Sequence, residues 1–307
     1  MKNTINFYYN IFLDELIKKD NCYYFYYGGD EYYFVPLNRP YDDVQGIYKL
    51  NLEMKKRRCL VHELVLNKDK SIITVVNGIS YVLIRLCKYK NDKVFLNDIN
   101  YIQNMTVNIE FDKSLVRDDW IKLWSEKIDY YEYQISQVGK KYPLLCDSLS
   151  YFIGMGENAI SYLVNNLDSK TNVNLVVSHK RIYQERGSLN FYDPLNFVVD
   201  NRVRDVAEFI KETFYNKTLN LYDLKSYFNM ANLNKNEYIL LLGRLLFPTY
   251  YFDIYDDIIN NGKSEELVIN IIDRTDEYES LLNTIYKFIL YEKKVRLEPI
   301  EWLQDKN

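Results

Sequence analysis

Two short turn signals within the first 90 residues limit this chain to folds that begin with a small antiparallel sheet. Gly28-Gly29-Asp30 and Asn77-Gly78 each separate two β-prone runs, and both sequences supply the positive φ angles that a tight hairpin turn requires. The runs around the first turn are strongly aromatic. We expect strands at Cys22–Tyr27, Glu31–Leu37, Ser71–Val76 and Ser80–Leu86.

Helix-like segments precede and separate these hairpins. Apolar residues from Ile5 to Leu16 recur at intervals of three and four, which predicts a helix over Met1–Lys18. Asp42–Leu60 reads as a second helix, with Asp42 or Asp43 as its N-cap. Residues 1–87 therefore predict a small lobe in which one helix packs on a sheet and another helix leads into it.

The pattern changes after residue 87. Lys88–Val116 has weak periodicity and reads as a connection between lobes, whereas residues 117–307 are mainly helical. A β-rich part followed by a helical part predicts an α+β fold with two lobes, and a cleft between lobes is the expected ligand site. The later predictions are helices near 121–138, Ser148–Asn166, Arg202–Tyr215, Tyr222–Phe228, Asn236–Leu246, Tyr250–Asn260, Glu265–Asp273 and Tyr278–Tyr291, a strand at Val173–Val177, and an extended segment at Leu189–Val199.

Composition excludes several classes of protein. A net charge of −4 over 307 residues gives no electrostatic footprint for nucleic acid, and the short cluster Lys55–Arg58 reads as the solvated end of a helix. The four cysteines form no Cys-x-x-Cys pair, so we expect no zinc site. No run is long and apolar enough to span a bilayer, and the N-terminus lacks a signal-peptide pattern; we expect synthesis in the cytoplasm. Most of the 31 tyrosines are expected to stand where other proteins carry phenylalanine.

The order of motifs after residue 173 carries the functional signal. A strand leads into Ser178-His179-Lys180-Arg181, Asn190–Pro194 follows, and Arg204-Asp205-Val206-Ala207 opens a helix. This order resembles the aminoglycoside phosphotransferase and choline kinase-like superfamily. Within it the chain is similar to the CotS/YutH-type spore coat proteins of endospore-forming Firmicutes, over roughly residues 20–300. Further segments that support this resemblance are Trp120–Trp124, Lys127–Tyr130, Tyr151–Gly154, Glu157–Ile160 and Leu246–Pro248.

The resemblance assigns roles to the loop after the predicted strand, and most of the catalytic ones are unfilled. His179 matches a mainly structural histidine, and we expect it in the core with a backbone hydrogen bond. Lys180 stands at a usual glycine, and Arg181 stands where the catalytic Asp should be. That Asp accepts a proton from the attacking hydroxyl, which a permanently protonated guanidinium cannot do. The metal-binding Asn expected five residues later is Arg186.

Other family positions are ambiguous. Asp193 is the best match to the magnesium-binding Asp, with Asp200 as a competing candidate, although Asp193 could simply cap a turn before Pro194. Asp205 matches an Asp that braces the catalytic loop, and an N-terminal helix cap is an equally good interpretation. We expect His62 to be a surface or capping residue.

The small lobe also departs from the family pattern. Kinases carry a phosphate-binding Lys on the third strand, but residues 32–39 contain none, and Arg39 is the nearest cation. Gly28 and Gly29 are the only remnant of a glycine-rich loop, and two adjacent glycines are usually an ordinary hairpin turn. Arg39, Gly28 and Gly29 are thus the only candidates for contacts with a cofactor.

Two functions remain open on these grounds. The first is a catalytically degenerate kinase-like protein that binds other proteins, such as coat or assembly partners, with no resident cofactor. The resemblance implies a place in the spore coat if the source organism sporulates. The alternative is an active small-molecule phosphotransferase that uses ATP and magnesium with relocated groups, in which Asp193 and Asp200 hold the metal and Glu185 acts as the base.

Overall fold

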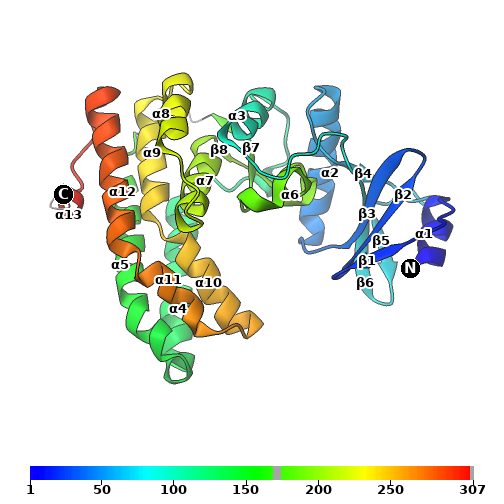
Figure 1. Ribbon diagram of the computed structural model, residues 1–307, viewed down its shortest axis with the longest axis horizontal. Coiled ribbons are helices and arrows are strands. Elements are labelled where there is room, and N and C mark those ends of the chain that lie inside the picture. The colour runs from blue at the N-terminus through cyan, green and yellow to red at the C-terminus, as the bar shows by residue number, and fades with distance from the viewer. Residues whose placement is uncertain (169–173, 305–307) are drawn as a thin grey trace. The chain divides into compact units, whose positions relative to one another are not determined.

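The computed structural model describes residues 1–168 and 174–304, and its chain forms two compact units (Figure 1). Unit 1 comprises Met1–Val116 with Leu175–Asp200, and unit 2 comprises Arg117–Asn174 with Asn201–Asn307. The break between residues 116 and 117 coincides with the expected end of the connecting segment. Residues 175–200 group with the N-terminal part, although the sequence-based division placed them in the C-terminal one.

Unit 1 contains both sheets. Its larger sheet has the strand order β1-β2-β3-β6-β4, with β5 also paired to β6, and every one of these pairs is antiparallel. A separate two-stranded sheet joins β7 and β8. The strands are β1 Ile17–Lys19, β2 Cys22–Tyr27, β3 Asp30–Pro36, β4 Glu63–Val65, β5 Ile73–Val76, β6 Ile79–Arg85, β7 Leu175–His179 and β8 Phe197–Asn201. The helices are α1 Lys2–Tyr9, α2 Tyr41–Lys56, α3 Leu96–Met105 and α6 Gly187–Phe191.

Both predicted hairpins are confirmed. Gly28 and Gly29 adopt φ of 60° and 85° between β2 and β3, and Asn77 and Gly78 adopt 51° and 80° between β5 and β6. The helix predicted from Asp42 is α2, but it begins at Tyr41 with Pro40 at the N-cap. The expected aspartate N-cap is therefore wrong, since proline already fixes the entry φ and Asp42 and Asp43 lie in the first turn.

The predicted N-terminal helix is too long. α1 ends at Tyr9, and its C-cap Asn10 adopts the left-handed conformation with φ 55°, which Asn tolerates better than most residues. The chain then runs extended, so that Ile11 and Leu13 are buried while Phe12 is 74% exposed. The last two residues of the predicted helix, Ile17 and Lys18, instead belong to the edge strand β1.

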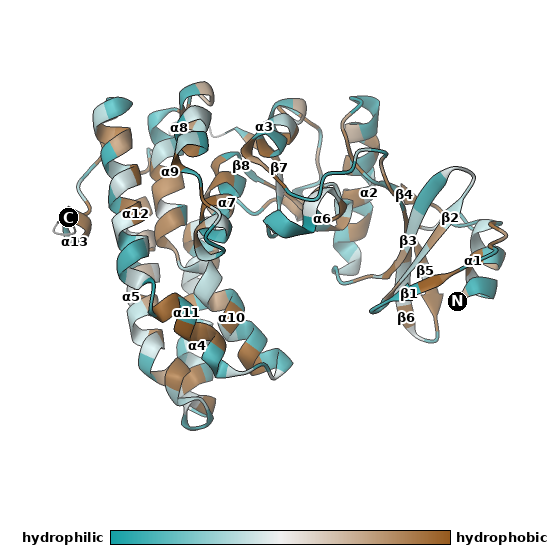
Figure 2. Ribbon diagram, in the orientation of Figure 1, coloured by the Kyte–Doolittle hydropathy of each residue, from teal (hydrophilic) through white to brown (hydrophobic). Residues whose placement is uncertain are grey.

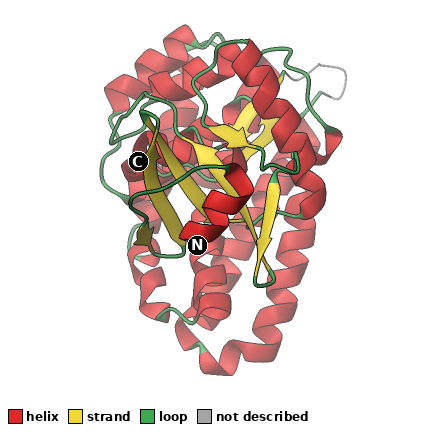
Figure 3. Ribbon diagram, turned by 90° about the vertical axis from the view of Figure 1, so that its right-hand side faces the viewer, coloured by secondary structure: helices red, strands yellow, loops and turns green. Residues whose placement is uncertain are grey.

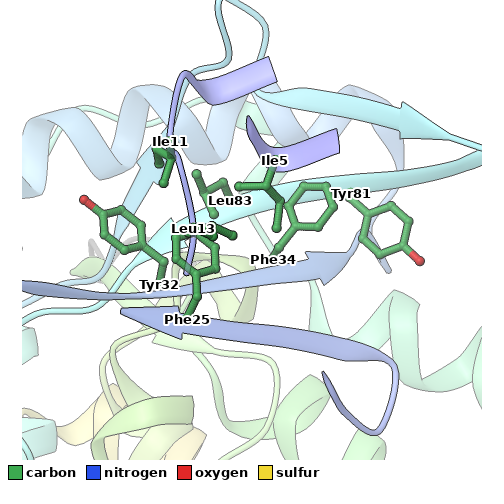
Figure 4. Packing of buried hydrophobic residues seen from close by; sticks show 8 residues of the cluster. All are labelled: Ile5, Ile11, Leu13, Phe25, Tyr32, Phe34, Tyr81 and Leu83. Atoms are coloured by element: carbon green, nitrogen blue, oxygen red, sulfur yellow. The ribbon is translucent and has the colours of Figure 1, made fainter. Parts of the chain in front are cut away.

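α1 and the residues after it cover one face of the larger sheet. Figure 3 shows α1 in front of the strands, and Figure 4 shows Ile5, Ile11 and Leu13 packed against side chains from three strands. The sheet contributes Phe25, Tyr32, Phe34, Tyr81 and Leu83 to this cluster. The aromatic strands predicted from the sequence therefore build the core beneath the larger sheet.

Unit 2 is helical. Its helices are α4 Trp120–Val138, α5 Pro143–Asn166, α7 Val203–Tyr215, α8 Leu221–Met230, α9 Lys235–Leu246, α10 Thr249–Asn261, α11 Ile269–Ile272, α12 Thr275–Lys287 and α13 Glu301–Gln304. The helix predicted near residues 121–138 is α4, and its buried stripe consists of Trp120, Trp124, Ile128 and Tyr131. Ile121, Ile135 and Val138, which have the same spacing, are only half-buried. Much of α9 is coloured brown in Figure 2, consistent with its burial against α5 and α7.

Every residue of α7 is buried. Its charges are matched by neighbours: Glu208 accepts hydrogen bonds from Arg244 (2.9 Å) and Lys211 (3.3 Å), and the Arg244 guanidinium lies 4.9 Å from the Trp120 ring. Buried charge is tolerated where ion pairs and hydrogen bonds compensate it. α7 is thus the central helix of unit 2.

Besides β1, the strands β4 and β8 were not predicted. β4 pairs with β6 through Leu64 and Ile84, and β8 occupies the end of a segment that was interpreted only as extended and turn-like. Part of that segment also forms α6. The predicted strand 173–177 corresponds to β7, which begins at Leu175; Val173 lies outside the described residues.

Candidate functional site

The loop that follows β7 begins with a buried histidine. His179 is 1% exposed, its Nε2 lies 2.8 Å from the carbonyl oxygen of Phe191, and its ring stacks on the Phe191 ring. The Phe197 ring packs edge-on against it. His179 therefore has the expected core position with a backbone hydrogen bond, and it ties the loop to α6.

The next two residues are held by Asn196. The Lys180 amide donates to the Asn196 carbonyl (2.8 Å), and the Asn196 side chain donates to the Arg181 carbonyl (2.9 Å). The Arg181 guanidinium donates to the Lys180 carbonyl at 2.7 Å. At the position of the expected catalytic Asp the structure thus has a cation, in a loop with a fixed backbone. Asn196 was missed, because no local pattern links it to residues 15 positions earlier.

The position expected to hold a metal-binding Asn is also cationic. Arg186 is exposed, and its guanidinium lies 4.2 Å from the Tyr183 ring. Glu185, the proposed substitute base, is exposed and pairs with Lys93 at 2.9 Å. Such a carboxylate on the surface is solvated and paired, which does not by itself provide the environment that tunes a general base.

The two candidate metal ligands lie at opposite ends of one short segment. Asp193 accepts the Leu195 amide (2.8 Å) as the N-cap of a 3₁₀ turn at Pro194–Asn196, as the turn-capping interpretation expects. Burial raises the pKa of the Asp193 carboxyl to about 6, against the opposing influence of Lys180, Arg39 and His179. Asp200 is fully buried near the end of β8.

No cluster of three or more metal-ligating side chains is present within residues 1–168 and 174–304. Asp193 and Asp200 could each offer a carboxylate, but in this arrangement a metal would take its remaining ligands from elsewhere. Their assignment as ligands stays a prediction.

The three candidates for cofactor contacts, Gly28, Gly29 and Arg39, have structural roles in the contacts that they make. Gly28 and Gly29 form the β2–β3 turn, and a Cβ at either position would meet no atom within 4 Å. The Arg39 guanidinium is enclosed, donates to the Phe197 carbonyl (3.0 Å) and pairs with Asp43 (3.4 Å). Arg39 therefore fastens the start of α2 to β8. Its assignment as a contact for a phosphate stays a prediction.

Asp205 lies in the first turn of α7 and is 1% exposed. It belongs to unit 2, whereas the loop after β7 belongs to unit 1. Its proposed role in bracing that loop stays a prediction.

His62 is the largest correction to the sequence-based interpretation. It is 2% exposed rather than a surface residue. Its Nδ1 accepts the Cys87 amide (3.1 Å), so Nε2 carries the proton and donates to the Leu189 carbonyl (3.1 Å). Its own amide donates to Tyr192, and its carbonyl accepts from Asn51. Burial lowers the pKa of His62 to about 4, so the ring is uncharged at neutral pH.

A cavity of about 290 Å³ lies beside His62, near the lower end of the size range of ligand pockets. Its walls come from β3, from the linker Leu86–Asp92 and from Glu185–Leu189. Glu31 and Lys90 form an ion pair at its edge. The cavity thus combines paired charges with the tyrosines Tyr33 and Tyr89. Sequence reasoning missed it because its walls come from three distant segments.

Comparison with known proteins identifies the family of the chain. The model of the family described as "Spore coat putative kinase YutH" matches residues 2–285. The chain belongs to this YutH family. It is 30% identical over 207 residues to the endospore coat-associated protein YutH of Bacillus subtilis (strain 168), a match that covers 60% of this chain and 61% of that relative.

Solved structures establish the fold of this YutH family member. An aminoglycoside phosphotransferase from Alicyclobacillus acidocaldarius has a TM-score of 0.65 at 10% identity, covering 92% of this chain and 94% of that one. A spectinomycin phosphotransferase bound to AMP has a TM-score of 0.62 at 8% identity, covering 93% and 96%. The predicted α+β, kinase-like fold is therefore confirmed. No helix among the described residues is long and apolar enough to cross a membrane.

Proposed function

We propose that this chain is a catalytically degenerate kinase-like protein that acts by binding other proteins, in association with the spore coat. The observation that carries the proposal is Arg181, a permanent cation at the position of the catalytic base. A general base must be able to accept a proton at the operating pH, and a guanidinium cannot.

The geometry around Arg181 supports loss of the base rather than its relocation. The loop backbone is fixed by Asn196, and the guanidinium is directed to the carbonyl of Lys180. Asp193 already serves as a turn cap, and Glu185 is a solvated surface carboxylate paired with Lys93. Arg39, the nearest candidate for a phosphate contact, is enclosed by Phe197 and Asp43.

The cavity beside the linker supports a function without nucleotide. A nucleobase is recognised through donors and acceptors along its edge, for which backbone groups of a linker are well suited. Here the Leu86 amide donates to Glu31, the Cys87 amide donates to His62, and the Asn91 amide donates to Ser188. These donors are already used inside the protein.

The coat association rests on the relatives. The matching family is described as a spore coat family, and the similar Bacillus subtilis protein is described as endospore coat-associated. A kinase-like fold without a catalytic base, in such a family, is consistent with a protein that acts through the binding of other proteins to its surface.

Calorimetric titration of the full chain with ATP, with and without magnesium, tests the loss of catalysis. We expect no heat of binding from protein whose fold is verified by circular dichroism. Magnesium-dependent binding in the micromolar range would support the phosphotransferase alternative. In that case Asp193→Asn and Asp200→Asn would show which carboxylate holds the metal, and a substrate screen would follow.

The coat association needs a separate test. A fluorescent fusion of the chain, produced in sporulating Bacillus subtilis, is expected to form a ring around the developing spore and to remain with the purified coat fraction. A diffuse signal from a full-length fusion would contradict the coat association while leaving the question of catalysis open.

A further inference from the structure

We propose that the linker Leu86–Val94 and the segment Gln184–Ser188 form a closed clasp, and that the cavity between them and β3 is preformed. The bonds that hold the walls of this cavity are made within the chain itself. The clasp lies wholly within unit 1 and is separate from the chemistry of residue 181.

The linker is first bonded to β3 of the larger sheet and to the residue that precedes β4. The Leu86 amide donates to the Glu31 carbonyl (2.9 Å), and the Glu31 carboxylate pairs with Lys90. The Cys87 amide donates to the buried ring of His62. Three bonds thus hold the first half of the linker, one of them to a side chain that is 2% exposed.

The other half of the linker is fastened to the segment after β7. Asn91 and Ser188 are joined twice: the Ser188 amide donates to the Asn91 carbonyl (2.8 Å), and the Asn91 amide donates to the Ser188 hydroxyl (3.0 Å). The Val94 amide donates to the Gln184 carbonyl (3.0 Å). Lys93 and Glu185 add an exposed ion pair. A reciprocal pair of this kind fixes both position and orientation of the two segments.

Gly187 allows the two segments to approach this closely. Its backbone has φ 52° and ψ −152°, a combination that is essentially restricted to glycine. A Cβ at this position would lie 2.1 Å from the Asn91 carbonyl oxygen and 2.7 Å from the Asp92 carbonyl carbon. Both obstacles are backbone atoms, so a side chain cannot be accommodated without separating linker and segment.

His62 connects the linker to the chain that follows the segment Gln184–Ser188. Its ring bonds the linker through Cys87 and the segment after β7 through Leu189, while its backbone bonds Tyr192 and Asn51. One buried residue therefore links α2, the linker and α6. Movement of one cavity wall would break bonds to the others, which is the physical basis for a preformed cavity.

Hydrogen exchange measured by mass spectrometry on the full chain tests the clasp. Peptides covering Leu86–Val94 and Gln184–Ser188 are expected to exchange at least tenfold more slowly than the peptide that contains the Asn77-Gly78 turn. Gly187→Ala is expected to accelerate exchange in both segments by tenfold or more. Peptides from α9 in unit 2 should keep their exchange rates.

Gly154→Ala is the matched control, since a Cβ at this glycine of α5 meets no atom within 4 Å. If Gly187→Ala does not fold, Ser188→Ala replaces it, because it deletes only the hydroxyl that accepts from Asn91. Its expected effect is a severalfold faster exchange in the linker peptide alone, with Ser280→Ala on α12 as control. Fast exchange of the wild-type linker, or unchanged exchange in Ser188→Ala, would overturn the clasp.

Discussion

Each unit contains a buried polar group, and the two groups are stabilised by different kinds of partner. In unit 2 the centre is ionic: Glu208 lies between Arg244 and Lys211, and Thr249 donates to it at 3.1 Å. In unit 1 the centre is His62, an uncharged ring whose partners are backbone groups. An ionic centre depends on each partner remaining present, whereas a neutral histidine depends on pH. The two units should therefore lose stability for different reasons.

Removing the carboxylate from the ionic centre should have the largest effect. Glu208→Ala leaves two buried cations without their shared counter-ion, which typically costs about 3–5 kcal/mol of the free energy of unfolding. Tryptophan fluorescence during urea unfolding can measure this loss, since Trp120 and Trp124 lie near Arg244. Glu126→Ala, at an exposed position of α4, is the control, and we expect it to change the free energy of unfolding by no more than about 0.5 kcal/mol. An equal, small effect of both substitutions would show that the ionic centre does not stabilise unit 2.

The neutral centre predicts acid sensitivity in unit 1. The folded pKa of His62, about 4, lies below its ordinary value of 6.5, so the unfolded chain binds the proton first as pH falls. The contribution of the neutral His62 ring to the free energy of unfolding is complete above pH 6.5 and declines between pH 6.5 and 4. Below pH 4 the protein has lost about 3 kcal/mol of stability through this residue.

His62→Gln removes this titration and isolates it from the other ionisable groups. We expect the variant to be less stable than wild type at pH 7, because it loses ring contacts, but to show a flatter decline between pH 6.5 and 4. Hydrogen exchange of Leu86–Val94, corrected for the intrinsic effect of pH, measures this locally. A parallel decline in both proteins would contradict the role assigned to His62.

The same contrast explains what could be predicted from the sequence. The hairpins at Gly28-Gly29 and Asn77-Gly78 are specified by adjacent residues, and the stripe on α4 by spacing within one helix. The loop at 179–181 was located through its family resemblance.

The missed features depend on distant partners. β4 exists because Leu64 pairs with Ile84, and His62 is buried because Cys87 and Leu189 bond its ring. Asn196 reaches back to Arg181 across 15 residues. None of these partners can be identified from periodicity, which explains why His62 was taken for a surface residue.

Asp193 should counteract His62 in the same pH range. Its pKa is raised from 3.8 to about 6, so the folded chain holds the proton more tightly, and this favours folding below pH 4. This stabilisation of the folded state by the protonated carboxyl is lost as pH rises through 6. Asp193→Asn keeps a side-chain oxygen that can cap the turn. It should stabilise the protein at pH 8 by about 1–2 kcal/mol, because water reaches part of the residue and weakens the effect of burial.

Thermal unfolding at pH 4 and pH 8 measures this difference. The variant should unfold at a higher temperature than wild type at pH 8 and at nearly the same temperature at pH 4. Asp92→Asn in the exposed part of the linker is the control. Destabilisation of Asp193→Asn at both pH values would indicate that the carboxylate is needed in its ionised form.

The smallest effect should come from the exposed ion pair of the clasp. Lys93 and Glu185 have side chains that are 47% and 56% exposed, and pairs this exposed usually contribute well under 1 kcal/mol because water and salt screen them. Lys93→Ala should therefore change the free energy of unfolding by less than about 0.5 kcal/mol and leave exchange in Leu86–Val94 unaltered. Ser188→Ala, which removes one partly buried hydrogen bond, should accelerate that exchange. If Lys93→Ala instead opens the linker, surface charge rather than the His62 and Ser188 bonds holds unit 1 together there, and the clasp would become sensitive to salt.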